Sequence, residues 1–244
     1  MDGILIVDKP VGMTSHDVVD RVRRITGVKK VGHGGTLDPL ASGVLPILIG
    51  KATKMSDKVI GSEKEYLVTI KFGENTDTDD AEGEVISKRD VPEKNNIEIE
   101  DILKKFQGTI EQVPPKYSAI KYKGRPLYKL ARKGIEVEMP PRQVQISNIS
   151  IISWSCPLLT LKINCSKGTY IRALARDIGE VIGCGGHVTE LRRMACGDFK
   201  IEDAKKLNEI STLQTLIPMI VTHSIYDIAN RKEKRDYIEI LWPR

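Results

Sequence analysis

The chain of 244 residues lacks the features that would place it in a membrane or outside the cell. It has no run of about 18 consecutive apolar residues, so no transmembrane helix is expected. An acidic residue follows Met1, and the apolar run after it is too short for a signal peptide. We therefore expect a cytoplasmic protein with no membrane partner.

Motifs that bind metals or cofactors are also missing. Four cysteines and four histidines occur, but none forms a C-x-x-C or H-x-x-x-H pair of the kind that binds zinc. In a cytosolic protein the cysteines are interpreted as core or incidental thiols rather than disulfides. The acidic stretch 73–84 does not have the ligand spacing of a calcium loop, and is interpreted as a solvated loop. With no P-loop and no G-x-G-x-x-G motif, we expect neither a metal nor a cofactor.

Charge is present in ordinary amounts, but its distribution is uneven. The net charge is +5, with 40% hydrophobic and 29% charged residues, which is typical of a globular domain. Residues 113–142 hold eight basic and two acidic side chains, a net charge of +6, which leaves −1 for the rest of the chain. We call this segment the basic insert. Such a concentration is typical of a surface that binds a phosphate backbone.

Three tyrosines, Tyr117, Tyr122 and Tyr128, are interleaved with these cations. Aromatic faces beside positive charge suit RNA, because bases stack on the rings while phosphates pair with the cations. A solvated amphipathic hairpin is the alternative. The residues expected to contact the RNA backbone are Lys116, Lys121, Lys123, Arg125, Lys129, Arg132 and Arg142.

Hydrophobic patterns predict strands and helices that are interspersed without a regular βαβ rhythm, as in an α+β fold. Alternation or short apolar runs predict strands at 3–7, 63–72, 144–154 and 158–165, while 44–49 is a strand or the start of a helix. Helical spacing predicts helices from Thr14 or Ser15 to Gly27, at 52–60 and 97–106, from Arg125 to Gly134, and from Ile171 to Gly183.

The most unusual stretch is 32–46, GHGGTLDPLASGVLP, which we call the Asp38 loop. It places one carboxylate, Asp38, among glycines and directly before Pro39. Glycine allows positive φ and close approach of other backbone, and a proline disfavours the helical conformation in the residue before it. We expect an acid held on a stiff turn. From the residues alone the alternative is an ordinary Asp-Pro turn, in which the carboxylate bonds its own backbone.

The run GHGGTLDPLASGVLPILIGKATK resembles the catalytic motif of the TruB family, the bacterial tRNA pseudouridine-55 synthases. The segments LIVDKPVGMTSHDVV, KEY, PPKYSAIK, CSKGTYIRALARDIG and HVTELRR resemble other motifs of this family, so the resemblance covers roughly 3–206. It implies the pseudouridine synthase fold, with a mixed, mostly antiparallel central sheet, flanking helices and an RNA-binding insert. We expect a catalytic domain at 1–215 and a short tail at 216–244, in place of the PUA domain that many members have.

The resemblance also implies roles for single residues. Asp38 corresponds to the catalytic nucleophile, Tyr66 to the active-site tyrosine, and Arg172 to the arginine that pairs with the nucleophile and favours its charged form. Without the family, Tyr66 is an aromatic side chain of a half-buried strand and Arg172 a surface cation of a helix. The residues implied to shape the substrate pocket are Lys9, Pro10, His33, Tyr170 and Leu191.

For three basic residues, the sequence leaves more than one role open. Lys9 is otherwise a solvated cation beside a turn, and Arg192 and Arg193 either touch phosphate or form a solvated pair.

The implied reaction is the isomerisation of uridine to pseudouridine at position 55 in the T-loop of tRNA. The base is flipped out of its stack, and His33 fills the space that it leaves. Asp38 attacks either the ribose anomeric carbon or uracil C6, and the sequence leaves both routes open. The expected partner is the T-arm stem-loop of tRNA, bound by a monomer.

Two other functions compete with this one. The first is a non-catalytic tRNA binder or folding chaperone, which the basic insert would also suit. The second is the guide-RNA-dependent synthase of archaea and eukaryotes, which resembles this chain around T-L-D-P but depends on a PUA domain.

Overall fold

The computed structural model describes residues 1–216 and 220–221, and has the expected α+β class. The chain divides into two compact units. Unit 1 comprises Met1–Lys64 and Arg192–Arg244, and unit 2 comprises Glu65–Leu191. Apart from Leu216, Ile220 and Val221, the predicted tail lies outside the described residues.

The sheet of unit 1 is built on a long antiparallel pair, β1 and β3. Residues Gly3 to Lys9 of β1 pair with Ile49 to Gly43 of β3, and the strand order is β14-β1-β3-β12. The stretch 44–49 is therefore a strand and not the start of a helix. The strands of this unit are β1 (Gly3–Lys9), β2 (Val31–His33), β3 (Ala41–Ile49), β13 (Phe199–Lys200), β14 (Lys205–Lys206), β15 (Ile220–Val221) and part of β12 (Gly186–Cys196).

Helix α1 (Ser15–Thr26) forms as its sequence predicts. The Thr14 hydroxyl accepts from the Asp17 N–H, and the Asp17 carboxylate accepts from the Thr14 N–H, which together make a capping box. Gly27 ends the helix at φ 67°. The remaining helices of the unit are short: η1 (Gly50–Met55), α2 (Ser56–Gly61), η2 (Ile201–Asp203), η3 (Leu207–Glu209) and α6 (Leu213–Leu216).

Apolar residues of β1 and β3 form the core of unit 1 together with η1 and α2. Ile4 and Ile6 of β1 and Val44 and Leu48 of β3 are all fully or almost fully buried. The Asp38 loop begins in β2 and ends in β3, so both of its ends belong to strands of the sheet.

Unit 2 contains a second run of strands, in the order β12-β4-β11-β10-β7. The period-two pattern of β4 is confirmed, because Tyr66, Val68, Ile70 and Phe72 are buried and the residues between them are partly exposed. The strands are β4 (Lys64–Phe72), β7 (Gly108–Gln112), β10 (Arg142–Ser155) and β11 (Leu158–Cys165), with two separate hairpins, β5 (Glu74–Thr76) with β6 (Val85–Lys88) and β8 (Lys121–Tyr122) with β9 (Arg125–Pro126).

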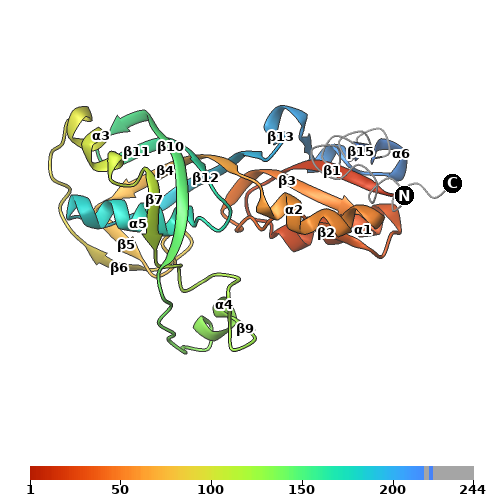
Figure 1. The fold of residues 1–244 in the computed structure, drawn as a ribbon, viewed down its shortest axis with the longest axis horizontal. Coiled ribbons are helices and arrows are strands. Elements are labelled where there is room, and N and C mark those ends of the chain that lie inside the picture. The colour runs from red at the N-terminus through yellow and green to blue at the C-terminus, as the bar shows by residue number, and fades with distance from the viewer. Residues whose placement is uncertain (217–219, 222–244) are drawn as a thin grey trace. The chain divides into compact units, whose positions relative to one another are not determined.

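Two longer helices belong to unit 2, and both follow their predictions closely. Helix α3 (Asn96–Lys104) buries Ile99 and Leu103. Helix α5 (Ile171–Ile182) ends at Gly183, whose φ is 98°. In the basic insert, the short helix α4 (Leu127–Ala131) begins two residues later than predicted, because Arg125–Pro126 forms β9. Within unit 2 the insert, with α4 and β9, projects from the strands as a lobe of its own (Figure 1).

Candidate active site

The main chain around Asp38 is held by side chains from distant parts of unit 1. The hydroxyl of Ser15 accepts from the Leu37 N–H at 2.8 Å and donates to the Leu37 carbonyl at 3.1 Å. The Asp38 carbonyl accepts from the Ala41 N–H at 3.1 Å. Asp38 is half-buried. The main chain on both sides of it has defined hydrogen-bond partners, as the pattern of glycines and proline predicts.

Lys9 closes the same loop from the end of β1. It is fully buried, and its ammonium donates to the carbonyls of Pro10 (2.9 Å), Met13 (2.6 Å) and Pro39 (3.4 Å). The Pro39 carbonyl also accepts from the Gly12 N–H at 2.8 Å. The interpretation of Lys9 as a solvated cation is therefore wrong. Lys9 binds the turn at Pro10 to the residue that follows Asp38.

Both alternatives for Arg193, a phosphate contact and a solvated pair, require an exposed guanidinium, and both are wrong. Only 1% of it is exposed, and its guanidinium donates to the carbonyls of Gly35, Thr36 and Val44. Arg192, in contrast, is partly exposed and pairs with Asp8 at 2.8 Å. Sequence reasoning missed Arg193 because its partners lie about 150 positions earlier in the chain.

His33 ends β2 at the entry of the Asp38 loop. Burial lowers the pKa of its imidazole below the ordinary value, and the nearby charges of Arg193 and His16 lower it further. Among the described residues, its buried Nδ1 has no hydrogen-bond partner. The ring is therefore neutral at neutral pH and suited to stacking or to apolar contact.

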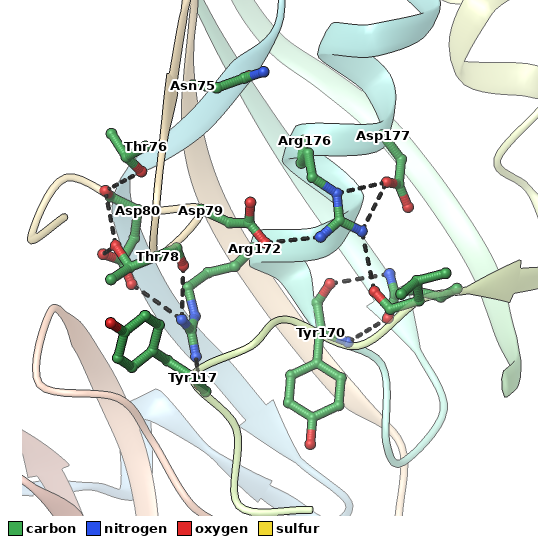
Figure 2. Close-up of polar contacts among 12 residues, drawn as sticks. Asn75, Thr76, Thr78, Asp79, Asp80, Tyr117, Tyr170, Arg172, Arg176 and Asp177 are labelled. Atoms are coloured by element: carbon green, nitrogen blue, oxygen red, sulfur yellow. Dashed lines mark hydrogen bonds and ion pairs between the residues drawn. The ribbon is translucent and has the colours of Figure 1, made fainter. Parts of the chain in front are cut away.

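In unit 2, Arg172 is buried and not a surface cation. Its guanidinium donates to the carbonyls of Thr78 and Tyr117, both at 2.8 Å, and lies 3.4 Å from the Asp80 carboxylate (Figure 2). A buried ion pair with further hydrogen bonds fixes the direction of the guanidinium. Asp38 belongs to unit 1, so its expected pairing with Arg172 stays a prediction.

Asp80 is a second buried residue that the sequence did not single out. The interpretation of 73–84 as a solvated loop is wrong for two of its residues, since Asp80 and Thr76 are only 3% and 4% exposed. The Asp80 carboxylate accepts from the Thr78 hydroxyl at 2.6 Å and from the Glu82 N–H at 3.1 Å. The threonine two residues before the aspartate is the local signal for this turn.

Arg176, one turn after Arg172 on α5, joins the acidic turn to the start of the basic insert (Figure 2). It donates to the Asp79 carboxylate at 2.9 Å and to the Val113 carbonyl at 3.0 Å. Burial raises the pKa of the Asp79 carboxyl to about 6, although the charges of Arg176 and Arg172 act in the opposite direction. The insert is thus tied to α5 at its first residue.

Tyr170 directly precedes α5, and its main chain is clamped by the side chain of Gln112, the last residue of β7. The Gln112 amide accepts from the Tyr170 N–H at 2.8 Å and donates to the Tyr170 carbonyl at 3.0 Å. Gln112 is 1% exposed. The position from which the Tyr170 ring extends is therefore fixed. Two other predicted pocket residues of unit 2, Tyr66 and Leu191, are also buried.

The predicted RNA contacts of the basic insert are exposed. Lys116 pairs with Glu136 at 2.7 Å, so it is partly neutralised. Two cations lie over tyrosine rings, Lys123 over Tyr122 at 5.3 Å and Arg132 over Tyr128 at 5.6 Å. Exposed cations beside aromatic rings suit RNA binding, and whether they contact RNA stays a prediction.

Throughout the described part of the chain, no group of three or more His, Cys, Asp and Glu side chains is arranged to hold a metal ion. Within residues 1–216 and 220–221, no helix is long and apolar enough to span a membrane. The four cysteines are free thiols, and three of them are buried.

Comparison with known proteins identifies relatives along most of the chain. Residues 23–171 match the family model described as TruB family pseudouridylate synthase (N terminal domain), and residues 172–224 match the tRNA pseudouridylate synthase B C-terminal domain. The chain is 47% identical over 222 residues to tRNA pseudouridine synthase B of Haemophilus influenzae, covering 90% of the chain and 70% of the relative. It is 50% identical over 222 residues to the protein of the same name from Clostridium kluyveri, covering 90% and 76%.

Solved structures give a similar result. A crystal structure of a Cbf5-Nop10-Gar1 complex matches with a TM-score of 0.67 and 31% identity, over 85% of this chain and 53% of the other. An H/ACA RNP bound to a substrate RNA containing 2′-deoxyuridine matches with a TM-score of 0.63 and 29% identity, over 85% and 51%. The chain spans about half the length of these two solved chains.

Proposed function

We propose that this chain, which belongs to the TruB family of pseudouridylate synthases, isomerises uridine to pseudouridine in tRNA, at position 55 of the T-loop. The observation that carries the proposal is the Asp38 loop. Its one carboxylate extends from a main chain whose neighbouring carbonyls accept from buried donors. A nucleophile gains most when its backbone is already in place before the substrate binds.

The uridine must leave its stack before a side chain of the protein can reach it. We assign to His33 the role of filling the space that the base leaves, since a neutral imidazole replaces a stacked base without burying a charge. Phosphates on either side of the flipped nucleotide would bind the cations of the basic insert. The T-arm stem-loop, bound by a monomer in the cytoplasm, is the proposed substrate.

Asp38 then forms a covalent bond with the nucleotide, by one of two routes. If it attacks the ribose anomeric carbon, the N1 bond breaks and uracil leaves as an anion. The uracil turns over, its C5 attacks the anomeric carbon, and the Asp38 carboxylate leaves. If it attacks uracil C6, the N1 bond to the anomeric carbon breaks and the base turns over as an adduct. Its C5 then bonds to the anomeric carbon, and the Asp38 carboxylate leaves C6. In both routes the C5 proton is lost and N1 regains a proton, so no oxidant, reductant or external group is needed.

The surrounding residues have supporting roles in this scheme. Tyr66 stacks on the uracil, and its phenol oxygen directs the C5 proton to a water or a base. Arg172 stabilises the Asp38 carboxylate as an anion, and Leu191 keeps water from the covalent intermediate. A hydrolytic glycosidase would need a second carboxylate to protonate the leaving oxygen. An isomerase that retains its uracil does not.

The assay that tests the proposal uses pure protein and an unmodified tRNA transcript, with pseudouridine mapped at each uridine. The wild-type protein should convert position 55 without any guide RNA. Asp38→Asn should reduce the rate by about 10⁴-fold or more while tRNA affinity and thermal unfolding stay near those of the wild type. Asp57→Asn, at an exposed aspartate of α2, is the matched control and should keep full activity.

Each rival predicts a different outcome. Conversion only with an added guide RNA would favour the guide-dependent class, to which the similarity with the H/ACA structure draws attention. Tight tRNA binding with no conversion by the wild-type protein would favour a non-catalytic binder. Undiminished conversion by Asp38→Asn would reject Asp38 as the nucleophile.

A further inference from the structure

Arg193 is a fully buried cation without an acidic partner among the described residues. Its Nε donates to the Val44 carbonyl at 2.7 Å, Nη1 to the Thr36 carbonyl at 3.3 Å, and Nη2 to the Gly35 carbonyl at 3.2 Å. A guanidinium without a carboxylate is unfavourable in a protein interior unless its donors are used elsewhere. Here three backbone carbonyl oxygens of the Asp38 loop accept these hydrogen bonds instead of a carboxylate.

In the sequence, two of the three carbonyls precede the proposed nucleophile and one follows it. Gly35 and Thr36 precede Asp38, and Val44 follows it after the chain has entered β3. One planar side chain therefore joins the entry of the Asp38 loop to its exit. A guanidinium suits this task because its donors have a fixed geometry, which a lysine ammonium lacks.

The main chain of Arg193 restrains the same loop a second time. Gly43 has φ 102°, and a Cβ atom at that position would lie 2.2 Å from the Arg193 carbonyl oxygen. Only glycine allows β3 to approach β12 this closely. The exit of the loop is thus held by both the backbone and the side chain of Arg193, and its entry is held by the side chain.

We infer that Arg193 is a positioning residue for the reaction: by bonding the main chain before and after Asp38, it sets the position and direction of the attacking carboxylate. The inference rests on the proposed function, because it assigns Asp38 as the nucleophile. Arg193 itself does not touch the substrate in this account. Its charge also contributes to keeping His33 neutral, which is consistent with a site built around it.

The test uses Arg193→Lys, which keeps the charge, and Arg193→Gln, which removes it, at a temperature where circular dichroism shows each variant folded. Amide hydrogen exchange reports the loop directly through the N–H groups of Leu37 and Ala41, which bond to Ser15 and Asp38. Both variants should exchange at these two amides at least tenfold faster, with the amides of β1 unchanged. Arg193→Lys is the deciding variant if Arg193→Gln does not fold.

Single-turnover kinetics with saturating protein then separate positioning from stability. Both variants should lose at least tenfold in the rate of conversion, with less than a threefold change in the Kd for tRNA. Arg24→Gln, which removes an exposed guanidinium from α1, should change neither quantity. A purely structural role would lower the melting temperature but leave the folded protein at the wild-type rate, and that result would overturn the inference.

Unchanged exchange at Leu37 and Ala41 would overturn it as well. If the wild-type protein makes no pseudouridine, the proposed function fails, and the exchange measurement still shows whether Arg193 fixes the loop.

Discussion

The Asp38 loop and the basic insert are both irregular stretches between strands, yet they are held in opposite ways. The loop is fixed along its length by Arg193, Ser15 and Lys9, which are all buried. The insert is fixed at its start, where Arg176 and Arg172 bind the carbonyls of Val113 and Tyr117. Beyond Ser118 its only buried residues are Leu127 and Leu130, and its cations face outward. The difference matches the two proposed roles, because a nucleophile requires a fixed position, whereas cations that bind a phosphate backbone do not.

The largest effect on stability should come from the start of the insert. Asp80→Asn removes the buried carboxylate that lies 3.4 Å from the Arg172 guanidinium, and removing one partner of a buried pair costs about 3–5 kcal/mol. Urea unfolding would measure the loss. Asp101→Asn, which breaks an exposed pair with Lys104 on α3, should change the free energy of unfolding by less than about 1 kcal/mol. Equal losses of free energy of unfolding in the two variants would contradict a stabilising role for the buried pair of Asp80 and Arg172.

A comparison of two lysines tests the contrast itself. Lys9→Met keeps the volume of the side chain but leaves the carbonyls of Pro10, Met13 and Pro39 without their charged donor. We expect a loss of about 3 kcal/mol in the free energy of unfolding. Lys121→Met, at an exposed position of the insert, should change it by less than about 0.5 kcal/mol. An unchanged free energy of unfolding in Lys9→Met would mean that the loop does not depend on the hydrogen bonds of Lys9.

The free energy of unfolding should depend on pH through Asp79, which pairs with Arg176 at the start of the insert. Its folded pKa of about 6 lies above the ordinary value of 3.8, so the folded state binds a proton more tightly than the unfolded state. The stabilisation is complete below pH 3.8 and is lost as the pH rises through 6, by up to about 3 kcal/mol. Asp79→Asn should flatten this part of the stability profile between pH 4 and 7. An unaltered slope would show that Asp79 does not titrate there.

For His33 in the Asp38 loop the sign is opposite. Its lowered pKa means that the unfolded state takes up the proton first, so stability is lost as the pH falls below the ordinary value of 6.5.

The smallest effect on stability, and a clear effect on binding, should come from the exposed part of the insert. The triple variant Lys121→Gln, Lys123→Gln and Arg125→Gln removes three exposed cations. Removing each cation that pairs with a phosphate should lower the slope of log K against log salt by about 0.7–0.9. Filter binding from 50 to 300 mM salt, about the range in which such ion pairs are screened, would measure it. Lys104→Gln with Lys105→Gln, on exposed positions at the end of α3, is the matched control and should leave the slope unchanged.

Local patterns in the sequence predicted the elements well, because their causes are local. The capping box at Thr14 and Asp17, the αL glycines that end α1 and α5, and the alternation in β4 all depend on residues a few positions apart. The Asp38 loop was recognised for the same reason. Its glycines and proline are adjacent to the residue that they constrain, and the family resemblance that they support is confirmed by the relatives.

The buried roles of Arg193 and Asp80 could not be predicted, because their partners are remote in sequence. Arg193 follows Arg192 in a strand, and nothing local distinguishes the buried cation from the partly exposed one. What distinguishes them is that alternate residues of β12 face opposite sides, and only the fold shows on which side the carbonyls of the Asp38 loop lie. Asp80 was assigned to a solvated stretch because five other acids surround it, whereas its burial depends on Arg172, which lies 92 positions later.

The clamp between Gln112 and Tyr170 has a mechanical consequence. Gln112 is the last residue before the insert, and its amide grips the neighbouring chain at both polar atoms of one residue. Under the proposed function, a displacement of the insert on RNA binding would meet β7 and the start of α5 at this clamp. If the insert binds RNA as proposed, it can adjust to the nucleic acid while the main chain of Tyr170 keeps its position.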